Sequence, residues 1–271
     1  MTNSSNSLLR ASLGTPPPCG HPRLRRAEHC TPLSQHGLPL RQPSEGFVRY
    51  KQRGSWGSGI AEDFSTFFLS SRIQSVYLHC YKGHMSKTLY IIAGCNGAGK
   101  TTASFTILPE IWHCKEFVNA DEIARGLSPL NPESVAMQAG RIMLERIEEL
   151  LNQGTSFSIE TTLATRSYVQ LVKRAQDEGY TVNLLFFWLN SPEVAIQRVA
   201  KRVSEGGHNI PTDVIRRRYQ LGLHNFFNLY KDVVDTWTLV DNASNPRQII
   251  AADGEIFNVE LYKIIESYVR K

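Results

Sequence analysis

A glycine-rich segment lies between an apolar run and a predicted helix, and it limits the folds open to this chain more than any other part of the sequence. Residues 94 to 101 read GCNGAGKT and match the pattern G-x-x-x-x-G-K-[ST]. Its glycines let successive backbone N–H groups point at one phosphate, and the N-terminus of the following helix adds partial positive charge. The pattern predicts a nucleotide site formed by Gly94, Cys95, Asn96, Gly97, Ala98, Gly99, Lys100, Thr101 and Thr102.

Two side chains of this segment have predicted chemical roles. Lys100 would bridge the β- and γ-phosphates, and Thr101 would offer its hydroxyl to a magnesium ion. The predicted cofactors are therefore ATP or GTP together with Mg²⁺. A glycine-rich turn without a ligand is the alternative, and the apolar run before the segment and the helix after it argue against that alternative. Cys95 is interpreted as a small residue rather than as a redox switch.

Short β-rich runs alternate with amphipathic helices from residue 85 onward, which predicts an α/β domain with a parallel sheet. The predicted strands are 89–93, 116–119, 156–160, 182–189 and 236–241, and the predicted helices are 100–107, 132–152, 167–178, 192–204 and 212–226. A loop is expected over 241–246, and a closing strand and helix over 256–269. Together with the phosphate segment, this order predicts the α/β fold class of the P-loop NTPases, a three-layer sandwich with a central, mainly parallel sheet.

The first 84 residues differ in composition from the rest of the chain. They contain ten basic and four acidic residues, whereas residues 85–271 contain twenty and twenty-one. Prolines, serines and glycines without apolar periodicity predict that this N-terminal extension is disordered. An organellar transit peptide and a regulatory tail are alternatives. The favoured interpretation is that translation begins at Met85 and that residues 1–84 are spurious, so the catalytic domain is predicted over 85–271.

Composition also excludes several classes of function. The near-neutral charge of residues 85–271 argues against a nucleic-acid partner. No stretch reaches the ~18 to 20 apolar residues of a membrane-spanning helix, so no membrane association is expected. Five unevenly spaced cysteines form neither a disulfide framework nor a zinc pattern, which predicts a reducing, cytoplasmic location.

Two carboxylates follow predicted strands, at the sheet edge where α/β proteins bind ligands. Asp121 is the candidate base that accepts a proton from a substrate hydroxyl, and a helix N-cap is its structural alternative. Glu160 is expected either to hold a magnesium-bound water or to bind a substrate hydroxyl, with an N-cap or a surface ion pair as the alternative. Thr161 and Thr162 stand beside it as hydroxyl donors to the substrate.

An arginine-rich stretch over residues 198–219 predicts two cationic helices joined by a Gly-Gly-His loop, which together form a mobile lid. Guanidinium groups can clamp phosphate oxygens and neutralise charge on a transferred group. Arg198 and Arg202 share a helical face, whereas the three arginines 216 to 218 fan across about 200° and cannot all reach one site. Two or three functional arginines are expected, with Arg202, Arg216 and Arg217 as the candidates. His208 is interpreted as a hydrogen-bonding loop residue.

These motifs, in this order, resemble the zeta-toxin family of P-loop kinases over residues 85–245. The matching features are the segment 94–102, Val118-Asn119-Ala120-Asp121, Ala139-Gly140-Arg141, Ile159-Glu160-Thr161-Thr162-Leu163 and the lid from Arg202 to Tyr219. The resemblance implies phosphorylation of a hydroxyl on a UDP-amino sugar, chiefly UDP-N-acetylglucosamine, by ATP or GTP. It also implies a small helical antitoxin as a partner that blocks the nucleotide site.

Site roles carried over from the family follow the same positions. Lys100 and Thr101 would bind nucleotide and Mg²⁺, and Asp121 would be the base. Glu160 and Thr162 would line the substrate side, while Arg202 and either Arg216 or Arg217 would contact phosphates.

The chain departs from the family pattern at Ala164, where better-studied members carry an arginine; here the nearest arginine is Arg166. This departure bears on recognition of the UDP-sugar and not on nucleotide binding. A kinase for another metabolite or for a nucleic-acid end therefore remains an alternative. A nucleotide-gated switch without phosphoryl transfer is a second alternative of a different class.

Overall fold

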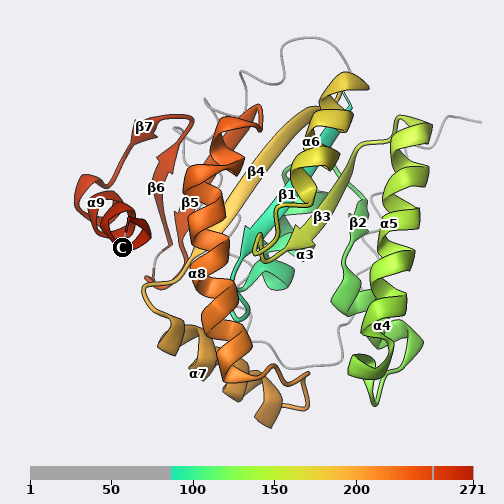
Figure 1. Cartoon of the computed structure of the whole chain (residues 1–271), viewed down its shortest axis with the longest axis horizontal. Helices are drawn as coiled ribbons and strands as arrows, with labels where there is room; N and C mark the ends of the chain where they lie inside the picture. Colours follow the sequence, from blue (N-terminus) through green and yellow to red (C-terminus); the bar gives the residue numbers. More distant parts are fainter. Residues whose placement is uncertain (1–86, 246, 271) are drawn as a thin grey trace, which may run out of the picture. The chain divides into compact units, whose positions relative to one another are not determined.

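The computed structural model describes residues 87–245 and 247–270. Within these ranges the strands are β1 (Thr88–Gly94), β2 (Glu116–Val118), β3 (Phe157–Thr161), β4 (Thr181–Trp188), β5 (Thr236–Asp241), β6 (Gln248–Ala252) and β7 (Glu255–Ile256). They form one sheet in the order β2-β3-β1-β4-β5-β6-β7 (Figure 1). The neighbours from β2 to β5 run parallel, whereas β6 and β7 add an antiparallel edge. The predicted central, mainly parallel sheet is confirmed.

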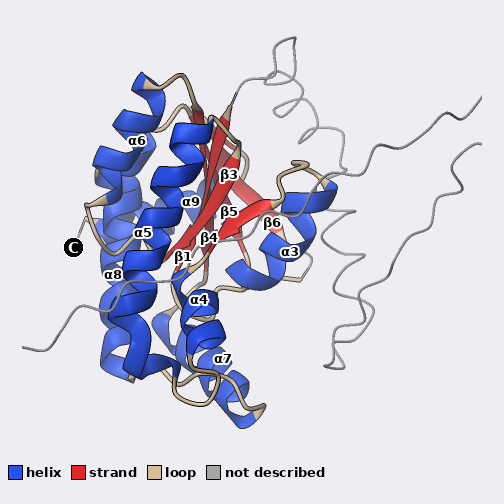
Figure 2. Cartoon of the chain, turned by 90° about the vertical axis from the view of Figure 1, so that its right-hand side faces the viewer, coloured by secondary structure: helices blue, strands red, loops and turns tan. Residues whose placement is uncertain are grey.

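Helices cover both faces of this sheet. The helices of the described residues are α3 (Lys100–Glu110), α4 (Ala120–Leu127), α5 (Ala136–Gln153), α6 (Tyr168–Asp177), α7 (Pro192–Ser204), α8 (Thr212–Asn228) and α9 (Val259–Val269), with 3-10 turns η1 (Pro132–Val135) and η2 (Tyr230–Asp232). Figure 2 shows α5, α6 and α8 on one side of the sheet and α3 on the other, which gives the predicted three layers. Helices α4 and α7 lie beyond the carboxyl ends of the parallel strands (Figure 1).

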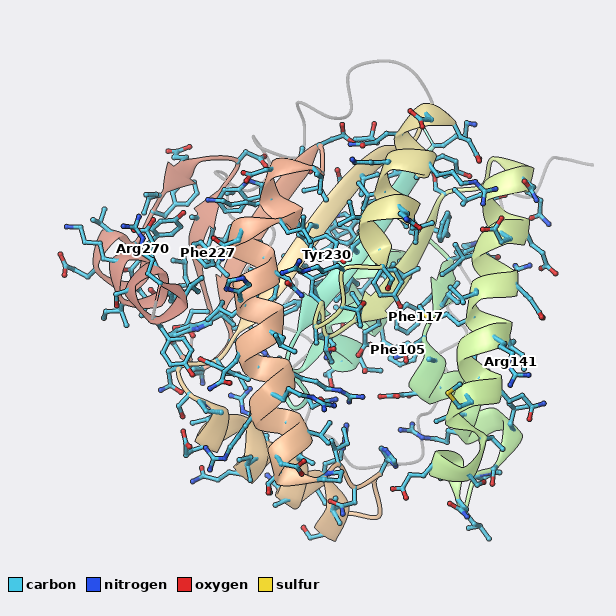
Figure 3. All side chains as sticks on the ribbon, in the orientation of Figure 1. Phe105, Phe117, Arg141, Phe227, Tyr230 and Arg270 are labelled. Atoms are coloured by element: carbon cyan, nitrogen blue, oxygen red, sulfur yellow. The ribbon has the colours of Figure 1, made fainter. Side chains whose placement is uncertain are left out.

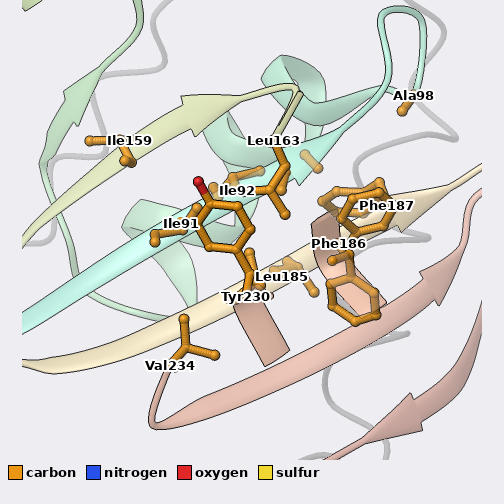
Figure 4. Close-up of a cluster of buried hydrophobic side chains, with 14 of the residues drawn as sticks. Ile91, Ile92, Ala98, Ile159, Leu163, Leu185, Phe186, Phe187, Tyr230 and Val234 are labelled. Atoms are coloured by element: carbon orange, nitrogen blue, oxygen red, sulfur yellow. The ribbon is translucent and has the colours of Figure 1, made fainter. Parts of the chain in front are cut away.

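The core is centred on β1 and β4, which are buried on both faces. Ile91, Ile92, Leu185 and Phe187 are at most 1% exposed, and they pack in a single cluster (Figure 4). Both strands read as continuous apolar runs because helices cover the sheet from both sides. This packing holds the carboxyl end of β1 in place, and the phosphate loop begins there.

An aromatic contact joins helix α3, which follows the phosphate loop, to strand β2. Phe105 on α3 meets Phe117 on β2 edge to face, with ring centroids 5.8 Å apart (Figure 3). The contact ties the end strand β2 to the helix that follows the phosphate loop. It therefore fixes the position from which Asn119 and Asp121 continue the chain.

The structure differs from the sequence prediction in three places. Strand β6 is absent from the predicted set, because a five-residue run beside a loop gives little signal of its own; it joins the sheet by antiparallel pairing with β5. The helix predicted over 132–152 begins with the 3-10 turn η1 before α5. Helix α4, expected only from the N-cap interpretation of Asp121, is present.

The predictions for residues 1–84 and for a start at Met85 fall outside the described residues. Among residues 87–245 and 247–270, no helix is both long enough and apolar enough to cross a membrane.

Candidate active site

The phosphate loop joins β1 to α3, and three of its glycines have positive φ: +140° at Gly94, +78° at Gly97 and +79° at Gly99. A Cβ atom at Gly94 would collide with the carbonyl oxygen of Phe187, and one at Gly97 would lie 2.8 Å from the carbonyl oxygen of Ala195. The backbones of β4 and α7 thus close around the loop. Both its conformation and the available space require glycine at these positions.

Lys100 and Thr101 converge on Glu160. The Lys100 ammonium donates to the Cys95 carbonyl oxygen at 3.1 Å and lies 3.6 Å from Glu160 Oε1. The Thr101 hydroxyl donates to Glu160 Oε2 at 2.8 Å. Glu160 reaches both residues because β3 pairs with β1, with Glu160 opposite Ile92. The structure therefore places Glu160 beside the phosphate-binding residues, next to the hydroxyl expected to face a metal ion.

Burial perturbs the ionisation of Glu160. Its side chain is 9% exposed, and removal from water raises the pKa of its carboxyl group. The Lys100 ammonium and the Thr101 hydroxyl act in the opposite direction, because both stabilise the charged carboxylate. A buried acid held between a cation and a hydroxyl is typical of functional sites.

Asn119 connects this cluster to α4. Its amide group donates to Glu160 Oε2 at 2.9 Å, and its carbonyl oxygen accepts the backbone N–H of Asp121, also at 2.9 Å. Asn119 is the N-cap of α4, so the interpretation of Asp121 as the N-cap is wrong. The Asp121 side chain is exposed, as expected for a group that must reach a substrate.

Arg202 on α7 faces the same carboxylates. Partial burial lowers the pKa of its guanidinium, while the charges of Asp121 and Glu160 raise it, so both acids lie within electrostatic reach. Its Nη2 donates to the His208 carbonyl oxygen at 2.8 Å, and its Nε is buried without a hydrogen-bond partner among the described residues. His208 also contacts Glu133 of η1 at 3.3 Å, which agrees with a hydrogen-bonding role in the loop between α7 and α8.

Of the three consecutive arginines on α8, Arg218 is the one whose guanidinium reaches the phosphate loop, donating to Asn96 Oδ1 at 3.2 Å. Arg216 forms an ion pair with Glu193 of α7 and is exposed. Arg217 is exposed as well. The structure therefore brings Arg202 to the site and does not bring Arg216 or Arg217 there. The helical spacing of the triplet predicts that its members diverge, but it does not say which of them faces inward.

Asn242 is a site residue that sequence reasoning missed. It follows β5, is 5% exposed, and its amide donates to the Ala98 carbonyl oxygen at 2.6 Å. The backbone carbonyl oxygen of Asn242 accepts from the Arg198 guanidinium at 2.9 Å. A polar residue after a buried strand is the signal that identified Asp121 and Glu160, and the same signal is present at Asn242. The sequence predicts only a loop over residues 241–246.

The remaining predicted site residues are Thr161, Thr162, Thr102 and Cys95. Thr161 accepts the backbone N–H of Leu163 at 3.0 Å, and Thr162 is half-buried beside it. Thr102 is exposed on α3. Burial raises the pKa of Cys95 to about 11, so its thiol stays protonated near neutral pH, which agrees with a packing role inside the loop.

A parallel sheet with the phosphate loop after its central strand, and a helical lid beyond the carboxyl ends, defines the P-loop kinases, which transfer phosphoryl groups from nucleotides. Comparison with known families narrows this class. The family model described as Zeta toxin matches residues 74–247, and the chain belongs to the zeta toxin family.

The chain is also similar to one further protein sequence and to several solved structures. An uncharacterized protein of Haemophilus influenzae is 30% identical over 135 residues, which cover 50% of this chain and 94% of the relative. The crystal structure of the AvrRxo1-ORF1:-ORF2 complex with ATP shares the fold, with 18% identity, a TM-score of 0.55, and coverage of 78% of this chain and 71% of that chain. The toxin–antitoxin system PezAT of Streptococcus pneumoniae has a TM-score of 0.48 at 16% identity, covering 80% of this chain and 97% of that chain.

Proposed function

We propose that this protein transfers the γ-phosphoryl group of ATP or GTP to a hydroxyl group of a small molecule, and that the acceptor is a UDP-amino sugar such as UDP-N-acetylglucosamine. The observation that carries the proposal is the convergence of Lys100, Thr101, Asn119 and Glu160 at the end of the phosphate loop. The exposed Asp121 stands next to this cluster through the Asn119 cap.

The nucleotide half of the reaction uses the phosphate loop. Its N–H groups and the Lys100 ammonium would hold the β- and γ-phosphates, and the transferred group would face Arg202 and Arg218. The structural relative AvrRxo1-ORF1:-ORF2 was crystallised with ATP, which supports a nucleotide in this chain too. The thiol of Cys95, protonated near neutral pH, adds no charge beside the phosphates.

The donor set around Thr101 fits a magnesium ion. Thr101 Oγ1 and the Glu160 carboxylate are hard oxygen ligands 2.8 Å apart, and Mg²⁺ prefers such ligands together with water and phosphate oxygens. When bound, the ion supplies positive charge that neutralises the phosphates. Among the two alternatives for Glu160, its position favours the magnesium-bound water over a substrate hydroxyl.

The acceptor half depends on Asp121. In the proposed reaction its carboxylate accepts the proton of the acceptor hydroxyl as the oxygen attacks the γ-phosphorus and the bond to the leaving nucleoside diphosphate breaks. Thr161 and Thr162 lie on the neighbouring segment, where their hydroxyls can bind the acceptor. The family resemblance supports a UDP-amino sugar, and Ala164 is the position at which recognition of that sugar differs from better-studied members.

The proposal is tested by incubating the purified chain with ATP or GTP, Mg²⁺ and a library of nucleotide sugars, and by identifying products by mass spectrometry. A phosphorylated UDP-amino sugar supports the full proposal. Phosphorylation of another metabolite instead would retain the kinase and replace the acceptor. Hydrolysis of ATP with no phosphorylated product from any acceptor would favour a nucleotide-gated switch and overturn the proposal.

The role of Asp121 is tested by Asp121→Asn. We expect a loss of roughly 10² to 10⁴-fold in kcat, because the amide cannot accept the proton, with nearly unchanged nucleotide affinity. Asp213→Asn is the matched control, since Asp213 is also exposed at the second position of a helix, α8. Equal turnover in Asp121→Asn and the wild type would remove the proposed base.

A helical antitoxin is proposed as a protein partner. The AvrRxo1 structure contains two gene products, ORF1 and ORF2, and the PezAT structure is described as a toxin–antitoxin system. In this chain, a partner helix laid across the phosphate loop would compete with ATP. Co-expression with the product of a neighbouring small gene, followed by a measurement of ATP affinity with and without it, tests the partner.

A further inference from the structure

One stripe of helix α8 contacts two loops of the site that are far apart in the sequence. Arg218, Gly222 and Asn225 stand at positions i, i+4 and i+7, within about 60° around the helix. Arg218 reaches Asn96 of the phosphate loop at 3.2 Å. Gly222 and Asn225 instead meet the segment 161–165 that follows Glu160, which we call the acceptor-side segment.

The contact at Gly222 is between two backbones. A Cβ atom at this position would overlap the carbonyl oxygen of Thr162. Gly222 is a buried residue inside a regular helix and has no positive φ, so the requirement is for space and not for an unusual conformation. The close approach means that any side chain at position 222 displaces Thr162.

Asn225 holds the next residue of the acceptor-side segment. Its amide donates to the Leu163 carbonyl oxygen at 2.8 Å, and Asn225 is 4% exposed. Tyr230, just beyond α8, donates to the Thr165 carbonyl oxygen at 2.7 Å. Three successive contacts from α8 and η2 therefore fix the backbone between residues 162 and 165.

Leu163 shows that these contacts impose a conformation. Its φ is +58°, in the left-handed region that a leucine rarely adopts, and its side chain is fully buried. Figure 4 shows Leu163 and Tyr230 beside Ile92 of β1. Such backbone conformations persist where the surroundings over-determine them, and they concentrate at functional sites.

We propose that Gly222 and Asn225 are positioning residues that hold the acceptor-side segment against α8, so that the helix carrying Arg218 sets the place of the acceptor relative to the phosphate loop. This inference rests on the proposed function in one respect, the acceptor role of Thr161 and Thr162. Its physical content is a rigid connection through α8 between Asn96 on one side and Thr162 and Leu163 on the other. Neither residue touches the acceptor itself.

The kinetic test compares the KM for the acceptor with the KM for the nucleotide. Gly222→Ala pushes Thr162 away, and Asn225→Leu removes the donor to Leu163 at similar volume. For both variants we expect the acceptor KM to rise roughly tenfold or more, because small displacements of substrate-positioning groups are costly. The nucleotide KM should stay near the wild-type value. A merely structural role would instead lower kcat through loss of folded enzyme and leave both KM values unchanged, which would overturn the inference.

A matched control is available in α5. Gly140 is also a helical glycine, but a Cβ atom there would meet nothing within 4 Å. Gly140→Ala should leave both KM values at the wild-type level. An acceptor KM raised equally in Gly140→Ala and Gly222→Ala would show that the effect is not specific to α8, and would contradict the proposal.

Hydrogen exchange separates this inference from the proposed function, because it needs no acceptor. In both variants the amides of residues 161–165 should exchange faster, while those of the phosphate loop exchange as in the wild type and as in Gly140→Ala. Unchanged exchange at residues 161–165 in both variants overturns the positioning role whether or not the wild type phosphorylates anything. If residues 161–165 exchange faster in the variants but the wild type phosphorylates no acceptor, the connection through α8 stands and only the proposed kinase activity is rejected.

Discussion

Neighbouring arginines on helix α8 are not equivalent, because their guanidinium groups point in different directions around the helix. Arg216 and Arg218 differ by two positions, about 200° around α8. Arg218 donates to Asn96 of the phosphate loop, whereas the exposed Arg216 pairs with Glu193 of α7. At an exposed position an ion pair of this kind contributes little to stability. We therefore propose Arg218 as the functional arginine of the triplet.

This assignment predicts opposite results for two similar substitutions. Arg218→Ala should lower kcat/KM for the nucleotide roughly 10²-fold, because a preorganised donor to the phosphate loop is lost. Arg216→Ala should leave kcat/KM close to the wild-type value, since Arg216 is exposed and pairs with Glu193 of α7. Steady-state kinetics with a coupled ADP assay measures both. A large loss in Arg216→Ala together with normal kinetics in Arg218→Ala would reverse the assignment.

At the scale of an element, helix α4 shows how a cap can also serve the site. Asn119 satisfies the backbone N–H of Asp121 at the start of α4 and donates its amide to Glu160. The cap orients the first turn, and this turn carries Asp121. A single asparagine therefore connects Glu160 to Asp121, the proposed base.

Two asparagine caps allow these two roles to be separated. Asn119→Ala and Asn258→Ala each remove a cap, since Asn258 caps α9 by accepting the N–H of Leu261 at 3.1 Å. Both should reduce the free energy of unfolding by about 1 kcal/mol. Only Asn119→Ala should also reduce kcat, because only Asn119 contacts Glu160. Urea unfolding and kinetics on the same preparations test this, and equal activity losses in the two variants would count against a role of Asn119 beyond capping.

Helix α8, like Asn119, connects parts of the candidate site that are far apart in the sequence. Tyr219 donates to the Leu189 carbonyl oxygen at 2.7 Å, which anchors the helix at the end of β4. From this anchor the helix reaches the phosphate loop on one side and the segment after β3 on the other. These three contacts hold α8 in a fixed position relative to the carboxyl end of β4, the phosphate loop and the segment after β3.

At the scale of the whole molecule, strand order assembles the site. Because β1 lies between β3 and β4, the loop after β1 is flanked by Glu160 on one side and by the backbone of Phe187 on the other. Next to β4, strand β5 delivers Asn242 to Ala98. Three chain segments far apart in the sequence, at Glu160, Phe187 and Asn242, therefore flank one phosphate loop.

The phosphate loop has this arrangement only in the folded chain, so nucleotide binding to the loop should stabilise the whole molecule against unfolding. At a concentration about 100 times its Kd, ATP with Mg²⁺ should raise the free energy of unfolding by about 2.7 kcal/mol. Lys100→Met should abolish this increase at the same ATP concentration. Thermal unfolding with and without ligand measures the effect. An unchanged Tm of the wild type at saturating ATP would argue against nucleotide binding by the native state.

Much of this architecture could be predicted from local patterns. The glycine spacing and Lys100 identify the phosphate loop, and the alternation of apolar runs with amphipathic helices identifies the parallel sheet. The same patterns identify Asp121 and Glu160 as polar residues that end buried strands. These features could be predicted because each depends on a few consecutive residues and on the period of one element.

The class of fold, the phosphate loop and the set of candidate acids and arginines follow from local sequence patterns. The contacts that build the site are known only from the folded chain: Glu160 with Thr101, Asn119 with Glu160, Arg218 with Asn96, and Asn242 with Ala98. Each of these contacts joins residues that are far apart in the sequence. Their distance depends on strand order and helix rotation, which the packing of the whole sheet establishes and no local pattern encodes.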